Sequence, residues 1–358
     1  MEVVWRRGGC GSGCGIALFK GYVLRSLSVI IPTLNEEDAI ADVLSDLGSQ
    51  TADVEVLVVD GGSSDRTVDV AHEGGAVVHS TQLRNRARQL NLGAEKAAHD
   101  WLLFLHADTR IPSSKTLEDA LEMIQAHRGG AGHFSLVFKG PDETHLGFQY
   151  LSRKTRLNRS NTTNGDQGFM MHREVFERLG PFDDSQPFLE DQKLAERIRE
   201  HAYWITLPGY LETSTRRFAK EGFAERYTLM AVMMGCHSTG IHQFFDVFQT
   251  YAPQCETQKL ELQNILDAVY EVTGAMPLAE RMHTWFKVGR YIRKNAWQIA
   301  LALDVYVLEE PENQALEFFD QHVDHRIDTV FWDAVTALLS AAYFHVLVPL
   351  RIRRKSLR

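Results

Sequence analysis

The chain has 358 residues, of which 44% are hydrophobic and 24% are charged, so it can bury a substantial core in one large domain with an appendage or in two domains. The formal net charge of −9, with no long basic stripe, argues against a general nucleic-acid binder. Four cysteines (Cys10, Cys14, Cys236 and Cys255) are too few and too scattered for a disulfide framework, which favours a reducing, cytoplasmic compartment.

Residues 1–25 do not look like part of a folded domain. Arg6 and Arg7 precede glycines, and the apolar segment 16–19 is too short for the hydrophobic region of a secretory signal. We interpret residues 1–25 as a disordered extension or an artefact of the start codon. The first domain should therefore cover residues 26–220.

Two apolar runs that end in turn-forming residues open this domain. Residues 29–31 are closed by Pro32, residues 54–59 are closed by Asp60, and an amphipathic segment lies between them. This pattern predicts a strand, a helix and a parallel strand, both strands being buried on two faces. Further strands are expected at 76–78, 101–105, 133–138, 169–171 and 202–207, and helices at 68–71, 83–98, 117–126, 173–179 and 191–200. Residues 141–163 are expected to form a mobile loop with a short helix that could close over a ligand.

Ligands of such a sheet bind at the carboxyl ends of its parallel strands. Polar residues at the ends of the first two strands should therefore surround one crevice, namely Thr33, Asn35, Glu36, Asp60 and Asp65. Acidic residues there suit hydroxyl or base N–H donors better than bare phosphate. The alternative is structural, because Asp60 and its glycines could simply form a turn that leads into a helix cap.

An ordered series of motifs in this domain resembles family-2 glycosyltransferases. The motifs are SVIIPTLNEE, VEVLVVDGGSSDRT, LLFLHADT, NGDQGFMMHREVFERLGPFDD, FLEDQKLAERI and TSTRRF, and they cover roughly residues 26–218. The combination of RARQLNLGA, LHADT and GDQG is most similar to a bacterial subgroup of radical-SAM/selenodomain-associated glycosyltransferases. The resemblance implies a GT-A fold, which has a mostly parallel Rossmann-like sheet and binds a nucleotide-diphosphate sugar. It also adds Pro32 to the candidate donor-binding residues at the ends of the first two strands.

His106 and Asp108 follow a strong apolar strand, where residues two apart face the same side. The resembling family usually has two aspartates here, which hold a divalent cation on the donor diphosphate. This chain keeps only the second, so the resemblance implies Asp108 and His106 as metal candidates, with an imidazole favouring Mn²⁺ over Mg²⁺. The alternative for Asp108 is a turn or cap before Pro112.

Four arginines are candidates for binding the diphosphate. Arg86 and Arg88 lie at a helix start, and the alternative is a solvated helix end. Arg216 and Arg217 follow the strand expected at 202–207 and resemble the family's Arg-rich ending, with a surface salt bridge as the alternative. Gly165, Asp166 and Gln167 occupy the segment that lines the acceptor side in the family, unless they form a turn that Asp166 caps.

Glu190 and Asp191 open a helix, whose N–H groups stabilise a nearby carboxylate. Together with the resemblance, this position implies that Asp191 takes the proton from an acceptor hydroxyl. Glu190 would then orient the acceptor or shift the pKa of Asp191. One base without a covalent nucleophile implies a single displacement with inversion. The alternative is that both acids only complement a helix N-terminus.

Residues 221–358 change to long helical periodicities and should form a helical extension. Residues 334–350 are nearly free of charge and precede Arg351, Arg353, Arg354 and Lys355. Three interpretations stay open for this segment, namely a core or oligomer helix, a helix on the inner membrane surface, and a membrane span. The many acids in 304–333 do not favour a membrane surface.

The sequence thus predicts a glycosyltransferase that moves a sugar from a nucleotide-diphosphate donor, a UDP-sugar by preference, to an unidentified acceptor hydroxyl. The missing first acid of the metal motif leaves open a catalytically inactive nucleotide-binding or scaffold protein with the same fold. A nucleotidyltransferase is a further alternative, but PTLNEED lacks the Gly-rich, Lys-containing loop that is usual in such enzymes.

Overall fold

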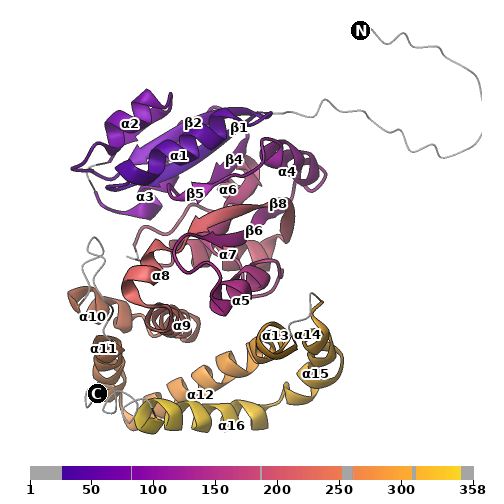
Figure 1. Ribbon diagram of the computed structural model, residues 1–358. Helices are drawn as coiled ribbons and strands as arrows, with labels where there is room; N and C mark the ends of the chain where they lie inside the picture. The colour runs from indigo at the N-terminus through magenta and orange to yellow at the C-terminus, as the bar shows by residue number, and fades with distance from the viewer. Residues whose placement is uncertain are drawn as a thin grey trace, which may run out of the picture.

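An eight-stranded sheet with helices on both faces forms the first part of the molecule (Figure 1). The computed structural model describes residues 26–81, 83–185, 188–251, 260, 262–308 and 312–347. The predictions for residues 1–25, for Cys255 and for the basic residues 351–355 lie outside the described residues. The strands are β1 (Ser26–Thr33), β2 (Asp53–Asp60), β3 (Val77–Ser80), β4 (Trp101–Phe104), β5 (Thr109–Arg110), β6 (Ala131–Lys139), β7 (Phe169–His172) and β8 (Trp204–Ser214).

The strand order is β3-β2-β1-β4-β7-β6-β8-β5. The first four strands in this order are mutually parallel, β7 is antiparallel to both of its neighbours, and β6 is parallel to β8. The α/β fold that the sequence predicts is confirmed, and its sheet is mixed, because β7 and β5 run antiparallel to the strands that they pair with. Because β2, β1 and β4 run in the same direction, Thr33, Asp60 and the residues after Phe104 emerge at one edge of the sheet.

Helices cover the two faces of the sheet because the apolar residues of its strands point alternately to each side. Leu27, Val29 and Ile31 of β1 pack with one set of helices, and Ile30 packs with the other. The first set is α1 (Glu37–Gly48), α2 (Thr67–Glu73) and α4 (Thr116–Gln125), and the second is α3 (Arg86–Lys96), α6 (Arg173–Leu179) and α7 (Glu190–His201).

β1 and β8 run farther than predicted, in each case through a proline. Pro32 was expected to end β1, but the strand continues to Thr33, since β2 pairs Pro32 with Val59 while β4 has already stopped pairing at Ile30. A missing N–H is tolerated at such a position. The last strand was expected at 202–207, but β8 runs through Pro208 to Ser214, because an irregularity in its pairing with β6 absorbs the proline and the following glycine.

A helical extension follows the sheet, as predicted, and its helices begin at Arg216 rather than Glu221. It comprises α8 (Arg216–Glu221), α9 (Phe223–Thr239), α10 (Gln243–Tyr251), α11 (Leu262–Ala275), α12 (Leu278–Lys294), α13 (Trp297–Leu303), the π-helix η2 (Asp304–Leu308), α14 (Gln314–Phe318), the π-helix η3 (Phe319–Val323), α15 (Asp324–Ile327), α16 (Val330–Ala342) and the π-helix η4 (Tyr343–Leu347). Cys236 of α9 is a buried free thiol.

The extension is packed onto the sheet domain through α5 (Leu146–Thr155), which occupies the segment predicted as a mobile loop with a short helix. Phe148 and Leu151 of α5 are buried in one cluster with Trp297 and Leu301 of α13. In Figure 1, α12 and α16 lie side by side at the end of the molecule that is farthest from the sheet. No single helix within the described ranges is long and apolar enough to cross a membrane, whereas the bent pair Gln314–Ile327 and Val330–Val346 passes that test together, with an angle of 101°.

Close packing of α3 on the sheet depends on Gly93, where an added Cβ would lie 2.3 Å from Cγ2 of Ile30. Ile30 is fully buried and stiff at χ1, so it cannot yield cheaply. We expect Gly93→Ala to lower the free energy of unfolding by about 1–3 kcal/mol, as overpacking does. The measurement is urea denaturation followed by circular dichroism.

Gly48 provides the matched control, because it also lies in a helix of this domain and an added Cβ would have nothing within 4 Å. Gly48→Ala should leave stability unchanged or raise it by up to about 1 kcal/mol through helix propensity. Equal effects of the two substitutions would contradict the packing role of Gly93.

Candidate functional site

The turn after β2 is held together by Asp60. This side chain is 3% exposed, and its Oδ2 accepts hydrogen bonds from the N–H groups of Gly62 (2.8 Å) and Ser63 (2.9 Å). Its Oδ1 accepts a hydrogen bond from the hydroxyl of Thr33 at 3.3 Å. Both oxygens are thus engaged within the protein, as the turn alternative expects, and a ligand that reached Asp60 would have to share these bonds.

The loops after β1 and β2 are joined into one rim. Asn35 has a left-handed backbone (φ 55°), and its Oδ1 accepts a hydrogen bond from the N–H of Ser64 at 2.8 Å. Asp65 accepts from the N–H of Thr67 at 3.0 Å with Oδ1 and from the N–H of Glu37 at 3.3 Å with Oδ2. The predicted residues of the two strand ends therefore lie together, with Asn35 and Asp65 serving as the links between the loops.

Sequence reasoning missed Gln89, whose buried side chain links the ends of β1 and β2. Its side chain is 4% exposed, and its Nε2 donates to the carbonyl oxygens of Thr33 (2.8 Å) and Val59 (2.7 Å). Thr33 is the last residue of β1, and Val59 is the last but one of β2. An amide on a helix next to charged residues gives no signal that it will be buried, so the sequence could not reveal this role.

A series of charged side chains connects this rim to the residues after β4. The Nη2 of Arg216 lies 2.6 Å from Oε2 of Glu36 and 3.8 Å from Oδ2 of Asp108. The cause is the sheet itself, because β5 begins immediately after Asp108 and pairs Thr109 with Thr213 near the end of β8. The start of α8 is thereby brought to the predicted crevice.

His106, which follows β4, is near enough to Arg86 of α3 and Arg217 of α8 for their charges to act on it. Burial, together with the charges of Arg86 and Arg217, lowers the pKa of His106 well below its ordinary value. The imidazole is therefore neutral at physiological pH, in the form that could bind a metal ion.

The N-terminus of α7 carries the two predicted catalytic acids. Glu190 is 5% exposed and forms an ion pair with Nε of Arg86, whose Nη2 lies 3.8 Å from Oδ2 of Asp191. Arg86, predicted to meet a diphosphate, is thus engaged by two carboxylates. Leu189, just before them, has a left-handed backbone (φ 61°), which is a strained conformation for a large side chain and is typical of functional sites.

The short 3-10 helix η1 (Gly165–Gln167) supports Asp191 from the other side. The N–H of Gly165 donates to Oδ2 of Asp191 at 2.7 Å. An added Cβ at Gly165 would lie 3.0 Å from that oxygen and 3.1 Å from Nη2 of Arg86, so only glycine fits without displacing either group. Asp191 is also held from its own helix, since its Oδ1 accepts from the N–H of Gln192 at 2.9 Å.

One carboxyl oxygen of Asp166 is shielded from water and, among the described residues, lacks a hydrogen-bond donor. Its Oδ1 is buried and has no hydrogen-bond partner in the described part of the chain. Burial, together with the negative charges of Asp191 and Asp108, raises the pKa of Asp166 to about 7, although Arg86 opposes the shift. Asp166 therefore carries a proton over much of the range in which ordinary carboxyl groups are ionised.

Gln167 was predicted on the acceptor side, but it is fully buried. Its Nε2 donates to the carbonyl oxygens of Phe134 (3.0 Å) and Thr155 (3.1 Å). These bonds fasten η1 to β6 and α5. We therefore interpret Gln167 as a positioning residue for Gly165 and Asp166, and not as a group that contacts an acceptor.

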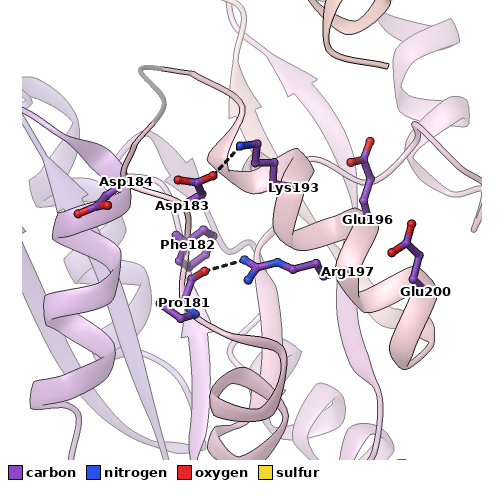
Figure 2. Close-up of a pocket in the computed structure, with 8 residues that line it drawn as sticks. All are labelled: Pro181, Phe182, Asp183, Asp184, Lys193, Glu196, Arg197 and Glu200. Atoms are coloured by element: carbon purple, nitrogen blue, oxygen red, sulfur yellow. Dashed lines mark hydrogen bonds and ion pairs between the residues drawn. The ribbon is translucent and has the colours of Figure 1, made fainter. Parts of the chain in front are cut away.

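Arg88 is not brought into this site. Its Nε lies 2.8 Å from Oδ2 of Asp184, which lines a separate surface hollow between the α6–α7 loop and α7. Figure 2 shows that this hollow is lined by charged side chains, with Lys193 directed to Asp183 (2.5 Å) and Arg197 directed to the carbonyl of Pro181 (2.6 Å). None of the other predicted site residues lines it.

The protein side chains alone do not make a complete metal site. Within the described ranges, no three His, Cys, Asp or Glu side chains lie close enough to hold a metal ion. Asp108 and the neutral His106 still offer one hard and one borderline ligand at the end of β4. Two such ligands fit a divalent cation that takes its remaining ligands from phosphate oxygens and water.

Comparison with known proteins gives a consistent picture. Residues 28–180 match the family model described as glycosyl transferase family 2. Protein RfbJ of Shigella flexneri is 31% identical over 122 residues, which is 32% of this chain and 95% of that protein. The GT-A-type fold implied by the sequence resemblance is confirmed, with its mixed sheet and C-terminal helical region.

Other relatives are matched over only part of their length. The 4,4'-diaponeurosporenoate glycosyltransferase of Staphylococcus haemolyticus is 34% identical over 119 residues, and the match spans 31% of this chain and 32% of the relative. A solved mannosyltransferase from Pyrobaculum calidifontis, in complex with GDP-Man and Mn²⁺, is similar with a TM-score of 0.46 and 18% identity, over 89% of this chain and 86% of that one.

The raised pKa of Asp166 predicts a measurable effect on stability. Between its ordinary value of 3.8 and about 7, the folded chain holds a proton that the unfolded chain has released, so this group makes the fold less stable as pH rises. Asp166→Asn removes that dependence. One pKa unit corresponds to about 1.4 kcal/mol, so the advantage of the variant over the wild type should grow by more than about 1 kcal/mol between pH 5 and pH 8.

The measurement is urea denaturation in EDTA at both pH values. Asp184→Asn, at the hollow of Figure 2, makes the same chemical change outside the site and should show no comparable trend. An advantage of Asp166→Asn that stays constant with pH would contradict the assignment.

Proposed function

This chain belongs to glycosyl transferase family 2, and we propose that it transfers a sugar from a nucleotide-diphosphate donor to an acceptor hydroxyl with inversion. The observation that carries the proposal is that two arginines connect the polar residues at the carboxyl ends of the parallel strands with neighbouring helices. Arg216 connects Glu36 with Asp108, and Arg86 connects the start of α3 with the acids of α7, while its charge also acts on His106 after β4. Donor groups and a base are thus close to one another.

In this proposal the rim formed by the loops after β1 and β2 receives the nucleoside. Carbonyl and carboxylate groups of this rim suit the hydroxyl and N–H donors of a ribose and a base. Arg216 and Arg217 would bind the diphosphate, since a planar guanidinium matches two phosphate oxygens. Arg216 would then exchange part of its ion pair with Glu36 for the incoming anion.

Asp191 is the proposed base. Its carboxylate is fixed by the N–H groups of Gly165 and Gln192, which holds it in one orientation beside the crevice. It takes the proton of the acceptor hydroxyl while that oxygen attacks the anomeric carbon and the nucleoside diphosphate leaves from the opposite face. Glu190 acts through Arg86 as a positioning residue, because its side chain is buried in that ion pair.

A divalent cation would be held by Asp108, with His106 beside it, and would neutralise charge on the departing diphosphate when bound. We further propose a uridine-based donor and a cytoplasmic location. The motifs RARQLNLGA, LHADT and GDQG support membership of the radical-SAM/selenodomain-associated subgroup as a further proposal. The rival is a catalytically inactive protein with the same fold that serves as a nucleotide-binding protein or as a scaffold. The ordered geometry around Asp191 favours the enzyme, because a scaffold would not need a strained Leu189 before its acids.

Asp191→Asn should lower turnover by about 10²–10⁴-fold, since it removes the proton acceptor, while donor affinity changes little. Turnover is measured as nucleoside diphosphate released from the best-binding sugar nucleotide, with a cell extract as the source of acceptor. Release of pyrophosphate instead would indicate nucleotidyl transfer. Asp184→Asn is the matched control and should keep full activity. Substantial residual transfer in Asp191→Asn would refute the base.

Asp108→Asn should weaken nucleotide binding in Mn²⁺ at least about tenfold, because the variant loses the hard ligand of the cation. Calorimetric titration of UDP, GDP and CDP, first with Mn²⁺ and then with EDTA, identifies the donor base as well. Equal binding by wild type and variant in both conditions would overturn the metal assignment. Absence of binding to all three nucleotides would favour the scaffold.

A further inference from the structure

Helix α16 is built with its polarity reversed. Its buried positions are Asp333, Ala337 and Ser340, which are small or polar. Its outward positions are large and apolar, with exposed fractions of 67% for Phe331, 74% for Leu338 and 64% for Leu339. A helix that covers a water-soluble core normally shows the opposite pattern.

The buried side of α16 is occupied by specific polar contacts with α12. Asp333 accepts hydrogen bonds from Nε of Arg290 (2.9 Å) and Nε of Arg293 (2.5 Å). The hydroxyl of Thr336 donates to the carbonyl of Gly289 at 2.8 Å. An added Cβ at Gly289 would lie 2.4 Å from the backbone of Ala337, so the two helices approach as closely as small residues allow.

The outward residues form one continuous stripe. Phe331, Leu338, Leu339 and Val346 are spaced by seven, one and seven residues, which places them within about a third of the helix circumference. Val346, in η4, is 52% exposed and extends the stripe. The only charged residue of α16 is Asp333, which is buried, so the stripe carries no charge of its own. A contiguous exposed apolar surface of this kind marks an interaction site.

Charges around the stripe indicate what covers it. In the sequence, residues 351–358 (RIRRKSLR) follow the stripe with five cations and no acid. Of the seven described acids in 304–333, four are engaged within the protein: Asp304 accepts from two N–H groups of α14, and Asp320, Asp328 and Asp333 pair with arginines. Glu312, Glu317 and Asp324 remain as acids near the stripe, against five cations in 351–358. Exposed Trp332 and Tyr343 flank the apolar residues, as aromatic side chains do at a lipid headgroup layer.

We propose that the stripe of α16 and η4 docks onto the surface of an anionic lipid bilayer, with α16 lying along the headgroup layer. α16 continues into η4, but the helix Val330–Val346 is not by itself long and apolar enough to span the hydrocarbon core. Apolar side chains of the stripe would enter the interface, and the five cations in the sequence 351–358 favour anionic over neutral lipid. This inference does not depend on the transferase assignment, because it concerns neither the crevice nor turnover.

The test is co-sedimentation of the full chain with vesicles of phosphatidylcholine alone and of phosphatidylcholine mixed with phosphatidylglycerol. We expect binding to the anionic vesicles and little binding to the neutral ones. The double variant Leu338→Gln, Leu339→Gln should reduce anionic binding at least about tenfold, since each leucine loses its apolar contact with lipid. The exposed positions make unfolding of the variant unexpected, which thermal denaturation verifies.

The matched control is Val77→Gln with Leu83→Gln, two apolar residues that are 49% and 53% exposed in the sheet domain. This control should bind vesicles like the wild type. Phe331→Gln, at the other end of the stripe, provides an independent variant. Light scattering of the same proteins measures oligomeric state. A dimer that dissociates in the stripe variants, without vesicle binding by the wild type, would overturn the proposal in favour of a second copy.

Discussion

The site depends on the ion pair between Arg86 and the acids at the start of α7. Glu190 is almost completely buried, and a buried carboxylate without a partner would cost several kcal/mol. Arg86 neutralises it and reaches toward Asp191 and His106 as well. Because Arg86 starts α3 while the acids start α7, this pair fixes two helix N-termini at the edge of the sheet. The close approach of these groups also requires a glycine at position 165, where an added Cβ would lie 3.0 Å from Oδ2 of Asp191 and 3.1 Å from Nη2 of Arg86.

Much of the sheet could be predicted because its strands are continuous apolar runs between turn residues, as in β2 and β4. The sequence also placed Asp60, Asp108 and Asp191 at element ends, where the structure has them. It could not predict what each side chain binds, because that depends on neighbours distant in sequence. Arg86 and Arg88 look alike in RARQLN, yet Arg86 pairs with Glu190 and Arg88 pairs with Asp184. Gln89 and Gln167 were buried by tertiary contacts that no local pattern reveals.

Two contacts made by helices of the extension are stabilised by different kinds of interaction. Where α13 meets α5, large side chains such as Trp297 and Phe148 form an ordinary core. Where α12 meets α16, contact depends on an arginine–aspartate network and a glycine, and the large apolar residues point outward. Such a pair gains little from burial of its own apolar side chains. Its exposed stripe is costly in water, so a partner surface that removes the stripe from water also stabilises the pair.

Charge balance constrains how the crevice can accept a donor. Five carboxyl groups, those of Glu36, Asp108, Asp166, Glu190 and Asp191, face three guanidinium groups, those of Arg86, Arg216 and Arg217. A diphosphate would add about two further negative charges to a surplus that already exists, and like charges repel strongly in such partly buried surroundings. Because the pKa of Asp166 is raised to about 7, a proton on this group removes one negative charge at pH values below that. A cation that arrives with the diphosphate would offset the rest, so the site is expected to bind donor and metal together rather than either alone.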